Sequence, residues 1–278
     1  MRSLEVERFN LVDTLECGQT FCWSREGKGY INADVGQVVY VEQKENILYY
    51  ETSHDDVDLQ KMFRLDDPLD DIQREISIDD FMKASIEFAP NLRIVSDPFF
   101  PTLVSFLCSV WKNIPAIQGM TQSIRREWGP SYYFRGKTYY GMPTPEQLSE
   151  ASVRDLMKLG LAWRAEFISK STDAILEEEI SDISLRSMVY SEAHKEMRKL
   201  HGVGNKVADC VCLFSLGFLE AFPMDVWIER VIQRQYDMLS KTGKSYSKKS
   251  AAARSYFGKY AGYAQQYLYY YSRCAVGF

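Results

Sequence analysis

The sequence predicts an α+β fold, in which an antiparallel β-rich domain over residues 1–97 packs on a mostly helical core over residues 98–278. Three observations support this class. Residues 1–60 hold short segments rich in β-branched and aromatic residues, separated by turn residues. From Pro98 onward, apolar residues recur at helical spacing. The length of 278 residues allows one or two domains with a sizeable core.

In the N-terminal part, residues 37–42 and 47–51 read as strands that flank a hairpin turn at residues 43–46. Gly18 stands alone between apolar residues in the segment 15–23, which indicates a bulge, a close backbone approach or a plain strand kink. Residues 52–95 are acidic. We expect them to form loops and short helices packed on the sheet, and we assign them no chemistry.

The C-terminal part reads as a series of helices. Residues 99–111 are nearly all apolar and predict a buried core helix. Residues 148–161 predict an amphipathic helix that Gly160 stops. Further helices run through Ile175 and Met197. Residues 253–272 form an aromatic-rich helical stripe, and such stripes usually belong to a core.

Residues 198–230 are the stretch around which the chain is organised. Gly202 and Gly204 make a short turn, and such glycines permit positive φ and close backbone approach to a ligand. An apolar helix follows directly, with Val207, Ala208 and Val211 on one face. The first backbone N–H groups of a helix lack partners within it, so they can hold a phosphate. Turn and helix together predict a clamp for a DNA backbone.

Two charged residues of this stretch point to chemistry. Lys206 lies in the first turn of the helix, where a cation is unfavourable for the helix dipole, so a role other than helix stability is indicated. Asp225 follows Pro223 and precedes another apolar helix. Asp225 could simply cap that helix, and Lys206 could be a solvated lysine. Either residue can cap or be solvated and still react.

Composition excludes several classes. No apolar run is long enough to span a membrane, and the first residues lack the apolar core of a signal peptide. Six cysteines in a chain of this length do not form a disulfide framework, which favours a reducing cytoplasm. Cys210 and Cys212 are too close together for the usual zinc spacing. We therefore expect no metal site.

The net charge of −5 argues against a nucleic-acid partner until its distribution is considered. Residues 193–278 contain 13 Lys and Arg against 6 Asp and Glu, a balance of +7, whereas the first 192 residues hold 20 against 32, a balance of −12. The local field governs approach to a polyanion, so the C-terminal third is a candidate DNA face. Its basic loop could equally be a solvated charge run: Lys241, Lys244, Lys248 and Lys249.

Residues 202–210, Gly-Val-Gly-Asn-Lys-Val-Ala-Asp-Cys, are followed by Pro-Met-Asp-Val at 223–226. This combination resembles the helix-hairpin-helix (HhH-GPD) DNA glycosylases, and more narrowly their 8-oxoguanine DNA glycosylase branch. The resemblance implies a TBP-like N-terminal β domain and a helical HhH-GPD core. It also implies that Lys206 is the nucleophile and Asp225 the catalytic aspartate. Relatives that bind an iron–sulfur cluster carry four clustered cysteines after the aspartate helix. Only Cys274 lies in that region here, so no cluster is expected.

Two further segments resemble the base pocket of that branch. Gly18-Gln-Thr-Phe-Cys-Trp23 is similar to the family's Gly-Gln-x-Phe-x-Trp, which implies that the Gly18 carbonyl accepts the N7–H that only the oxidised base possesses. Residues 262–269 resemble Gly-Trp-Ala-Gln-x-x-Leu-Phe. Gln265 would then bond the Watson–Crick edge, Tyr269 would stack on the base, and Cys210 would cover its other side. Gln265 and Tyr269 share a helical face. Tyr in place of Phe needs a partner for its hydroxyl, and Ser272 replaces an acidic residue.

The DNA contacts follow the family less closely. In Ser109-Val-Trp-Lys-Asn-Ile-Pro-Ala-Ile117, Asn113 matches, but Trp111 replaces an asparagine near the vacated base position, and Ala116 replaces an arginine that reads the orphaned base. Strong restriction to cytosine opposite the lesion is therefore not expected. Trp163 and Arg164 match the family's aromatic wedge and its cytosine-reading arginine. The alternative is that Trp163 belongs to the core and Arg164 is a surface charge.

The resemblance implies a bifunctional glycosylase and AP lyase that acts on 8-oxoguanine in duplex DNA. The damaged nucleotide must leave the stack to be reached. Lys206, kept neutral by burial and positive neighbours, would attack the sugar C1′, and Asp225 would stabilise the positive sugar. The resulting Schiff base permits β-elimination. We expect a monomer that needs no cofactor and binds no membrane. We expect it in the cytoplasm, associated with the nucleoid in a bacterium, or in the nucleus in a eukaryote. The alternatives are an alkylated-purine glycosylase of the same fold, or a non-catalytic DNA-binding module.

Overall fold

The computed structural model describes residues 1–243 and 245–277. The chain forms two compact units, and each is assembled from separate segments. Unit 1 comprises residues 1–6, 20–58 and 97–204, and unit 2 comprises residues 7–19, 59–96 and 205–278. The expected division of the chain at residue 97 stays a prediction.

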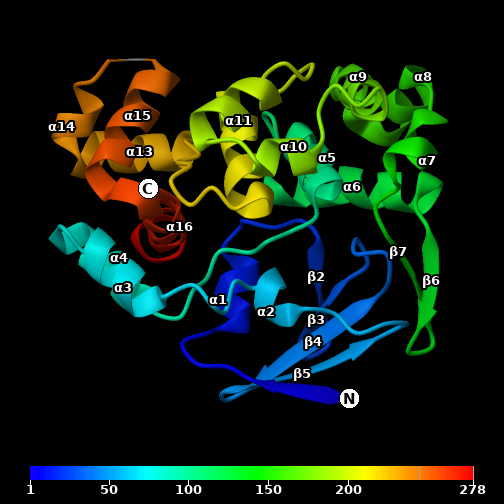
Figure 1. Ribbon diagram of the computed structural model, residues 1–278, viewed down its shortest axis with the longest axis horizontal. Helices are drawn as coiled ribbons and strands as arrows, with labels where there is room; N and C mark the ends of the chain where they lie inside the picture. The colour runs from blue at the N-terminus through cyan, green and yellow to red at the C-terminus, as the bar shows by residue number, and fades with distance from the viewer. Residues whose placement is uncertain (244, 278) are drawn as a thin grey trace. The chain divides into compact units, whose positions relative to one another are not determined.

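Unit 1 contains an antiparallel sheet in the order β1-β5-β4-β3-β2, which Figure 1 shows in blue. Its strands are β1 (Arg2–Glu5), β2 (Trp23–Glu26), β3 (Gly29–Asn32), β4 (Val39–Lys44) and β5 (Ile47–Thr52). The hairpin expected around residues 43–46 is confirmed, but β4 runs on to Lys44, which pairs with Ile47. Glu45 therefore turns tightly, with φ 53°. This sheet and the helices that follow it confirm the α+β class.

The helices of unit 1 begin with α5 (Phe99–Cys108), which is buried from Phe100 onward, as the sequence predicts. The remaining helical elements are α6 (Ile114–Trp128), α7 (Pro145–Ser149), α8 (Val153–Leu156), a π-helical turn (Met157–Leu161), α9 (Arg164–Leu176), α10 (Asp182–Arg186) and α11 (Tyr190–Met197).

Two expectations for unit 1 are wrong. The single helix over residues 148–161 is broken, because the Ser152 side chain accepts the Asp155 N–H and begins a new helix. The hairpin of β6 (Ser131–Phe134) and β7 (Lys137–Tyr140) interrupts a region read as helical. Its strands are short and aromatic, so helical spacing around them concealed their pattern.

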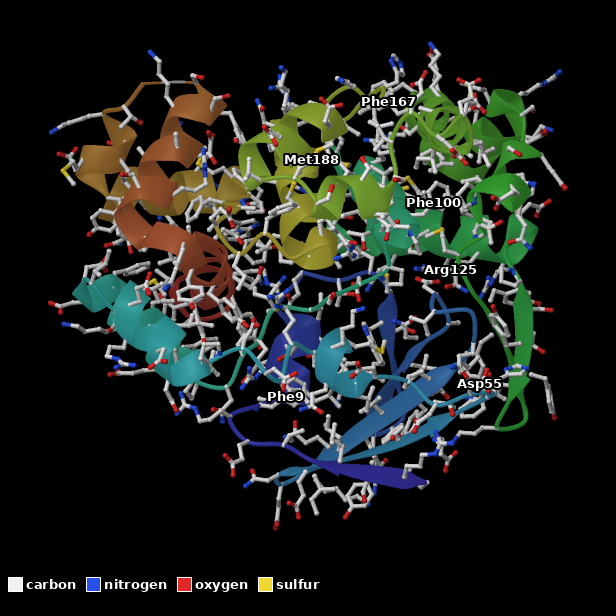
Figure 2. The ribbon with its side chains drawn as sticks, in the orientation of Figure 1. Phe9, Asp55, Phe100, Arg125, Phe167 and Met188 are labelled. Carbon is white, nitrogen blue, oxygen red and sulfur yellow. The ribbon has the colours of Figure 1, made fainter. Side chains whose placement is uncertain are left out.

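A buried ion pair fixes α6 within unit 1. Arg125, labelled in Figure 2, donates to Asp34 Oδ1 at 3.0 Å and to Asp34 Oδ2 at 2.5 Å, and also to the Phe21 carbonyl at 2.9 Å. The Met142 N–H donates to Asp34 as well, at 2.7 Å. Because the pair is saturated with hydrogen bonds, it tolerates burial and holds α6 in place.

Unit 2 is mostly helical. It begins with α1 (Leu11–Glu16), capped by Asn10, so the β reading of residues 1–60 is wrong there. The acidic segment forms short helices, as expected: α2 (Leu59–Met62), α3 (Leu69–Ile76) and α4 (Asp80–Phe88). Packing on the sheet was expected, whereas α3 and α4 contact α16 of this unit. The remaining elements are α12 (Asn205–Val211), a π-helical turn (Cys212–Leu216), α13 (Val226–Gln235), α14 (Asp237–Ser240), α15 (Tyr246–Phe257), a 3₁₀ turn (Gly258–Tyr260), α16 (Ala261–Tyr271) and a π-helical turn (Ser272–Val276).

Helix α16, red in Figure 1, lies at the centre of unit 2 and contacts α4, α13 and α15. Tyr263 and Tyr267 on it are fully buried. Their hydroxyls are satisfied, because Tyr263 donates to Asp67 at 2.7 Å and Gln73 donates to Tyr267 at 2.8 Å. These two rings of the aromatic stripe are therefore core. Among the described residues, no helix has the length and apolar character needed to cross a membrane.

Candidate active site

Unit 2 brings the two predicted catalytic residues together. Lys206 is half-buried near the start of α12. Asp225 caps α13, because its side chain accepts the Ile228 N–H at 2.9 Å. Burial raises the pKa of the Asp225 carboxyl, and the charge of Lys206 acts in the opposite direction. Asp225 thus serves as a helix cap and also lies within the electrostatic range of the amine.

Cys210 follows Lys206 by one helical turn and is buried. Burial raises the pKa of its thiol to about 12, although the charge of Lys206 and a hydrogen bond from it act to lower that pKa. Asp209 and Asp225 also interact with this thiol. Besides Lys206, the charged groups that act on Cys210 are therefore carboxylates, whereas positive neighbours were expected for the lysine.

Tyr246 connects the two catalytic elements. Its hydroxyl donates to Asp209 Oδ2 at 2.6 Å and accepts the Met224 N–H at 3.1 Å. Asp209 lies on the helix of Lys206, and Met224 immediately precedes Asp225. The Tyr246 hydroxyl therefore fixes the segment that carries the carboxylate against the helix that carries the amine. Nothing in the sequence pattern marked this residue.

Gln265 on α16 presents an unsatisfied group. Its Oε1 atom is buried and has no hydrogen-bond partner among the residues that the structure describes. An unpaired buried acceptor costs about 1–3 kcal/mol, so this oxygen suits a ligand that brings a donor. Gly262 positions α16: its N–H donates to the Leu219 carbonyl at 2.7 Å, and the Leu213 side chain fills the space a Cβ would need.

Gly18 lies against Tyr269. Its φ is 92°, and a Cβ built on it would meet Arg273 Nη1 at 2.9 Å and Tyr269 Cε1 at 3.1 Å. Of the readings left open for this glycine, close approach is the one observed. The turn is held firmly: Gln266 Nε2 donates to the Cys17 carbonyl at 3.0 Å, and the Gln19 side chain donates to the Thr14 carbonyl at 2.7 Å.

These contacts join the predicted base-pocket and catalytic residues within one unit. The charge of Asp225 interacts with the Tyr269 phenol, which in turn packs on Gly18. Gln265 lies one turn before Tyr269 on α16. The cluster therefore combines an amine, a carboxylate, an unsatisfied amide and an aromatic face.

The predicted DNA-contacting residues lie in unit 1. Trp163 is 45% exposed, whereas Arg164 is only 3% exposed. The alternative of a buried tryptophan and an exposed arginine is therefore wrong. Arg164 Nε donates to the Val110 carbonyl at 3.0 Å, its Nη2 donates to the same oxygen, and the guanidinium lies 4.2 Å from the Trp163 ring. Arg164 therefore supports the exposed ring.

The other DNA-contact candidates are placed as follows. Asn113 caps α6 by accepting the Ala116 N–H at 3.1 Å. Trp111 is 88% exposed and has a φ of 57°. Gly202 has a φ of 83° and lies directly against Phe167, which Figure 2 labels. Gly204 is exposed, with open space where a Cβ would be, so a phosphate can approach its backbone.

The basic run near the C-terminus is partly neutralised. Lys249 is buried on α15 and donates to Glu229 at 3.1 Å, and Lys241 pairs with Asp237. Lys248 is exposed, and Lys244 lies outside the described residues. The expected basic loop is therefore partly helix. No group of His, Cys, Asp and Glu suited to a metal ion is present in the described ranges.

Sequence reasoning missed Arg273, whose guanidinium lies 5.3 Å from the centre of the Tyr269 ring. A hydrogen bond between Arg273 and the Tyr269 phenol contributes to the electrostatics of both groups. The signal was present in the sequence, because Tyr269 needs a hydroxyl partner and Arg273 follows it at helical spacing.

Comparison with known proteins gives consistent results. Residues 3–103 match the model of the 8-oxoguanine DNA glycosylase N-terminal domain, and residues 104–255 match that of the HhH-GPD superfamily base excision DNA repair proteins. A probable N-glycosylase/DNA lyase of Methanothermobacter thermautotrophicus is 32% identical over 207 residues, which cover 66% of this chain and 63% of that protein. The chain thus spans less than two thirds of that relative. An N-glycosylase/DNA lyase of Saccharomyces cerevisiae is 29% identical, covering 82% of this chain and 68% of that protein.

One solved structure extends the comparison to the fold. Clostridium acetobutylicum 8-oxoguanine glycosylase/lyase, in complex with double-stranded DNA containing cytosine opposite 8-oxoguanine, matches with a TM-score of 0.89 and 31% identity. The match covers 96% of this chain and 93% of that one.

Proposed function

Because the chain belongs to the 8-oxoguanine DNA glycosylase family of the HhH-GPD superfamily, we propose that it excises 8-oxoguanine from duplex DNA and then cleaves the strand as an AP lyase. One observation supports this most directly: Lys206 lies within electrostatic range of Asp225, in the same unit as Gly18, Gln265 and Tyr269. An alkylated-purine glycosylase would need no such lysine.

The reaction begins with the damaged nucleotide outside the stack. The Lys206 Nζ lone pair forms a bond to the sugar C1′ as the bond from C1′ to N9 breaks, and the departing electron pair goes to the base, which then takes up a proton. The Asp225 carboxylate stabilises the positive charge that develops on the sugar. Nζ then loses a proton and the C1′–O4′ bond breaks, with O4′ taking up a proton, and the Schiff base left between Nζ and C1′ acts as an electron sink. Loss of a C2′ proton then expels the 3′ phosphate.

The pocket reads the base from several sides. The Gly18 carbonyl accepts the N7–H of 8-oxoguanine, whereas the N7 of guanine is an acceptor and would repel it. Gln265 Oε1, which lacks a partner among the described residues, accepts from the Watson–Crick edge. Tyr269 and Cys210 cover the two faces of the ring. Every group comes from one chain, so we propose that the protein acts as a monomer at the DNA of the cell.

Unit 1 carries the proposed DNA contacts. The exposed ring of Trp163 is the wedge, and Asn113, Arg164, Gly202 and Gly204 contact the strands. Arg164 already uses its Nε and Nη2 donors on the Val110 carbonyl, and the Ala116 side chain has no hydrogen-bond donor. Each good bidentate contact with a base contributes about 1–3 kcal/mol of discrimination, so its loss weakens the reading of the opposite base.

Excision from duplexes that pair 8-oxoguanine with each of the four bases tests the function. We expect release of 8-oxoguanine and a borohydride-trapped adduct, with single-turnover rates that differ by less than roughly tenfold among the four partners. No release from any duplex contradicts the proposed function. Release restricted strongly to cytosine contradicts only the interpretation of Ala116 and Arg164.

A Gly18→Ala variant tests the pocket. A residue with a side chain is strained at a φ of 92°, and the new methyl group displaces Arg273 and Tyr269. We expect the free energy of unfolding to fall by about 1–3 kcal/mol, and excision of 8-oxoguanine to fall by roughly tenfold more than cleavage at an abasic site. Gly36→Ala is the matched control, because Gly36 has a φ of 76° with nothing within 4 Å of its Cβ position. It should lose stability without that selective loss of excision.

A further inference from the structure

The guanidinium of Arg273 is held beside Gly18. Its Nη2 donates to the Glu16 carbonyl at 2.6 Å, at the C-terminal end of α1, where a cation is favoured by the helix dipole. Its Nη1 lies 2.9 Å from the position of a Cβ on Gly18. The Tyr269 ring stacks near it, at 5.3 Å. Three contacts therefore fix one positive charge at the turn that faces the base.

This charge is not neutralised by its strongest partners. The side chains that interact most strongly with Arg273 are those of Tyr269 and Cys274, a phenol and a thiol rather than carboxylates. Burial raises the pKa of Tyr269, which keeps this phenol neutral. The Arg273 guanidinium therefore places a positive charge beside Gly18.

We propose that Arg273 is a specificity-determining residue that selects against cationic alkylated purines by charge. This inference rests on the proposed function, in which the Gly18 carbonyl faces N7 of the base. A purine methylated at N7 carries a formal positive charge on the ring that contains N7 and C8. Arg273 would face that charge at short range in a partly desolvated site, where repulsion is strong. Neutral 8-oxoguanine meets no such repulsion.

The positive charge of Arg273 also stabilises the transition state in which a neutral base is released. Breaking the bond from C1′ to N9 leaves the electron pair on the base, so the departing 8-oxoguanine becomes negative before it takes up a proton. A fixed guanidinium stabilises that developing charge. A methylated base leaves as a neutral molecule, so no negative charge develops on it for the cation to stabilise. Arg273 therefore favours the oxidised base over the alkylated one in both the bound state and the transition state.

The test compares single-turnover release of 8-oxoguanine and of 7-methylguanine from matched duplexes, by wild type, Arg273→Met and Arg273→Lys. We expect Arg273→Met to lower the ratio of the two rates by roughly tenfold or more, through slower release of 8-oxoguanine and faster release of 7-methylguanine. Arg273→Lys retains the charge and should hold the ratio within about threefold of wild type. Cleavage at an abasic site, where no base is bound, gives each variant the reference rate against which its release of the two bases is compared.

The possible failures are distinguishable. A wild-type protein that does not release 8-oxoguanine contradicts the proposed function itself. If wild type releases it and Arg273→Met slows both bases equally, Arg273 only supports Tyr269, and the charge selection is wrong. An equal change of ratio in Arg273→Met and Arg273→Lys would also overturn it, because charge would not be the cause. Should Arg273→Met fail to fold, Arg273→Gln provides the same neutralisation with a polar side chain.

Discussion

Lys206→Gln is expected to abolish the covalent adduct between protein and DNA that borohydride traps in the wild type. Glutamine is similar in length and has a similar helix propensity, so α12 should persist. Its amide cannot form a Schiff base, and both the glycosylase and the lyase steps lose their nucleophile. We expect excision to fall by on the order of 10⁴-fold or more, a typical loss when a nucleophile is removed.

Trapping on gels and single-turnover excision measure this effect, and binding to lesion DNA should be retained. Lys248→Gln is the matched control, because it makes the same chemical change at an exposed lysine of α15 that is not among the proposed site residues. It should trap as the wild type does. A trapped adduct with Lys206→Gln would show that a different amine reacts and that Lys206 is not the nucleophile.

The residues that were assigned a chemical role from the sequence lie in the same part of the structure. Gly18, Lys206, Asp225 and Gln265 were predicted from short segments far apart in the chain, and unit 2 contains all of them. Two of these positions also meet a local requirement, because Gly18 has a φ of 92° and Asp225 caps a helix. Local requirements are visible in a sequence because a few adjacent residues determine them.

The missed features depend on partners distant in sequence. Tyr246 acts through Asp209, 37 residues earlier, and Arg273 through the Glu16 carbonyl, 257 residues earlier. No period or motif encodes either of these distant pairs, and the helical spacing of Tyr269 and Arg273 marks only the contact between those two residues. The alternative for Trp163 and Arg164 failed for a related reason: only the Val110 carbonyl explains why the arginine is the buried member. The β6–β7 hairpin was missed because its strands are too short to establish a period.

Asp225→Asn separates the structural from the chemical role of the same residue. Asparagine is as good a helix cap as aspartate, and its side-chain oxygen can still accept the Ile228 N–H. Thermal stability and DNA binding should therefore be retained. The negative charge near the sugar is lost, so we expect turnover to fall by on the order of 10²–10³-fold, as when a preorganised stabilising group is removed.

Asp79→Asn is the matched control for this variant. Asp79 is also an N-cap aspartate of unit 2, and it accepts the Met82 N–H at 2.8 Å, whereas the carboxylates that act on the Cys210 thiol are Asp209 and Asp225. Its turnover should stay at the wild-type level. Equal turnover in Asp225→Asn and Asp79→Asn would show that Asp225 only caps its helix and has no electrostatic role in the reaction.

The pH dependence provides a second measurement of the Asp225 charge. Only the ionised carboxylate can stabilise the positive sugar, so wild-type activity should be lost as pH falls through the pKa of Asp225. Burial raises that pKa above 3.8, so the loss should begin at a higher pH than for an exposed aspartate. Asp225→Asn has no such group, and the acid limb of its residual activity should shift or disappear. If both proteins lose activity at the same low pH, another group causes the limb, and the electrostatic role of Asp225 must be rejected.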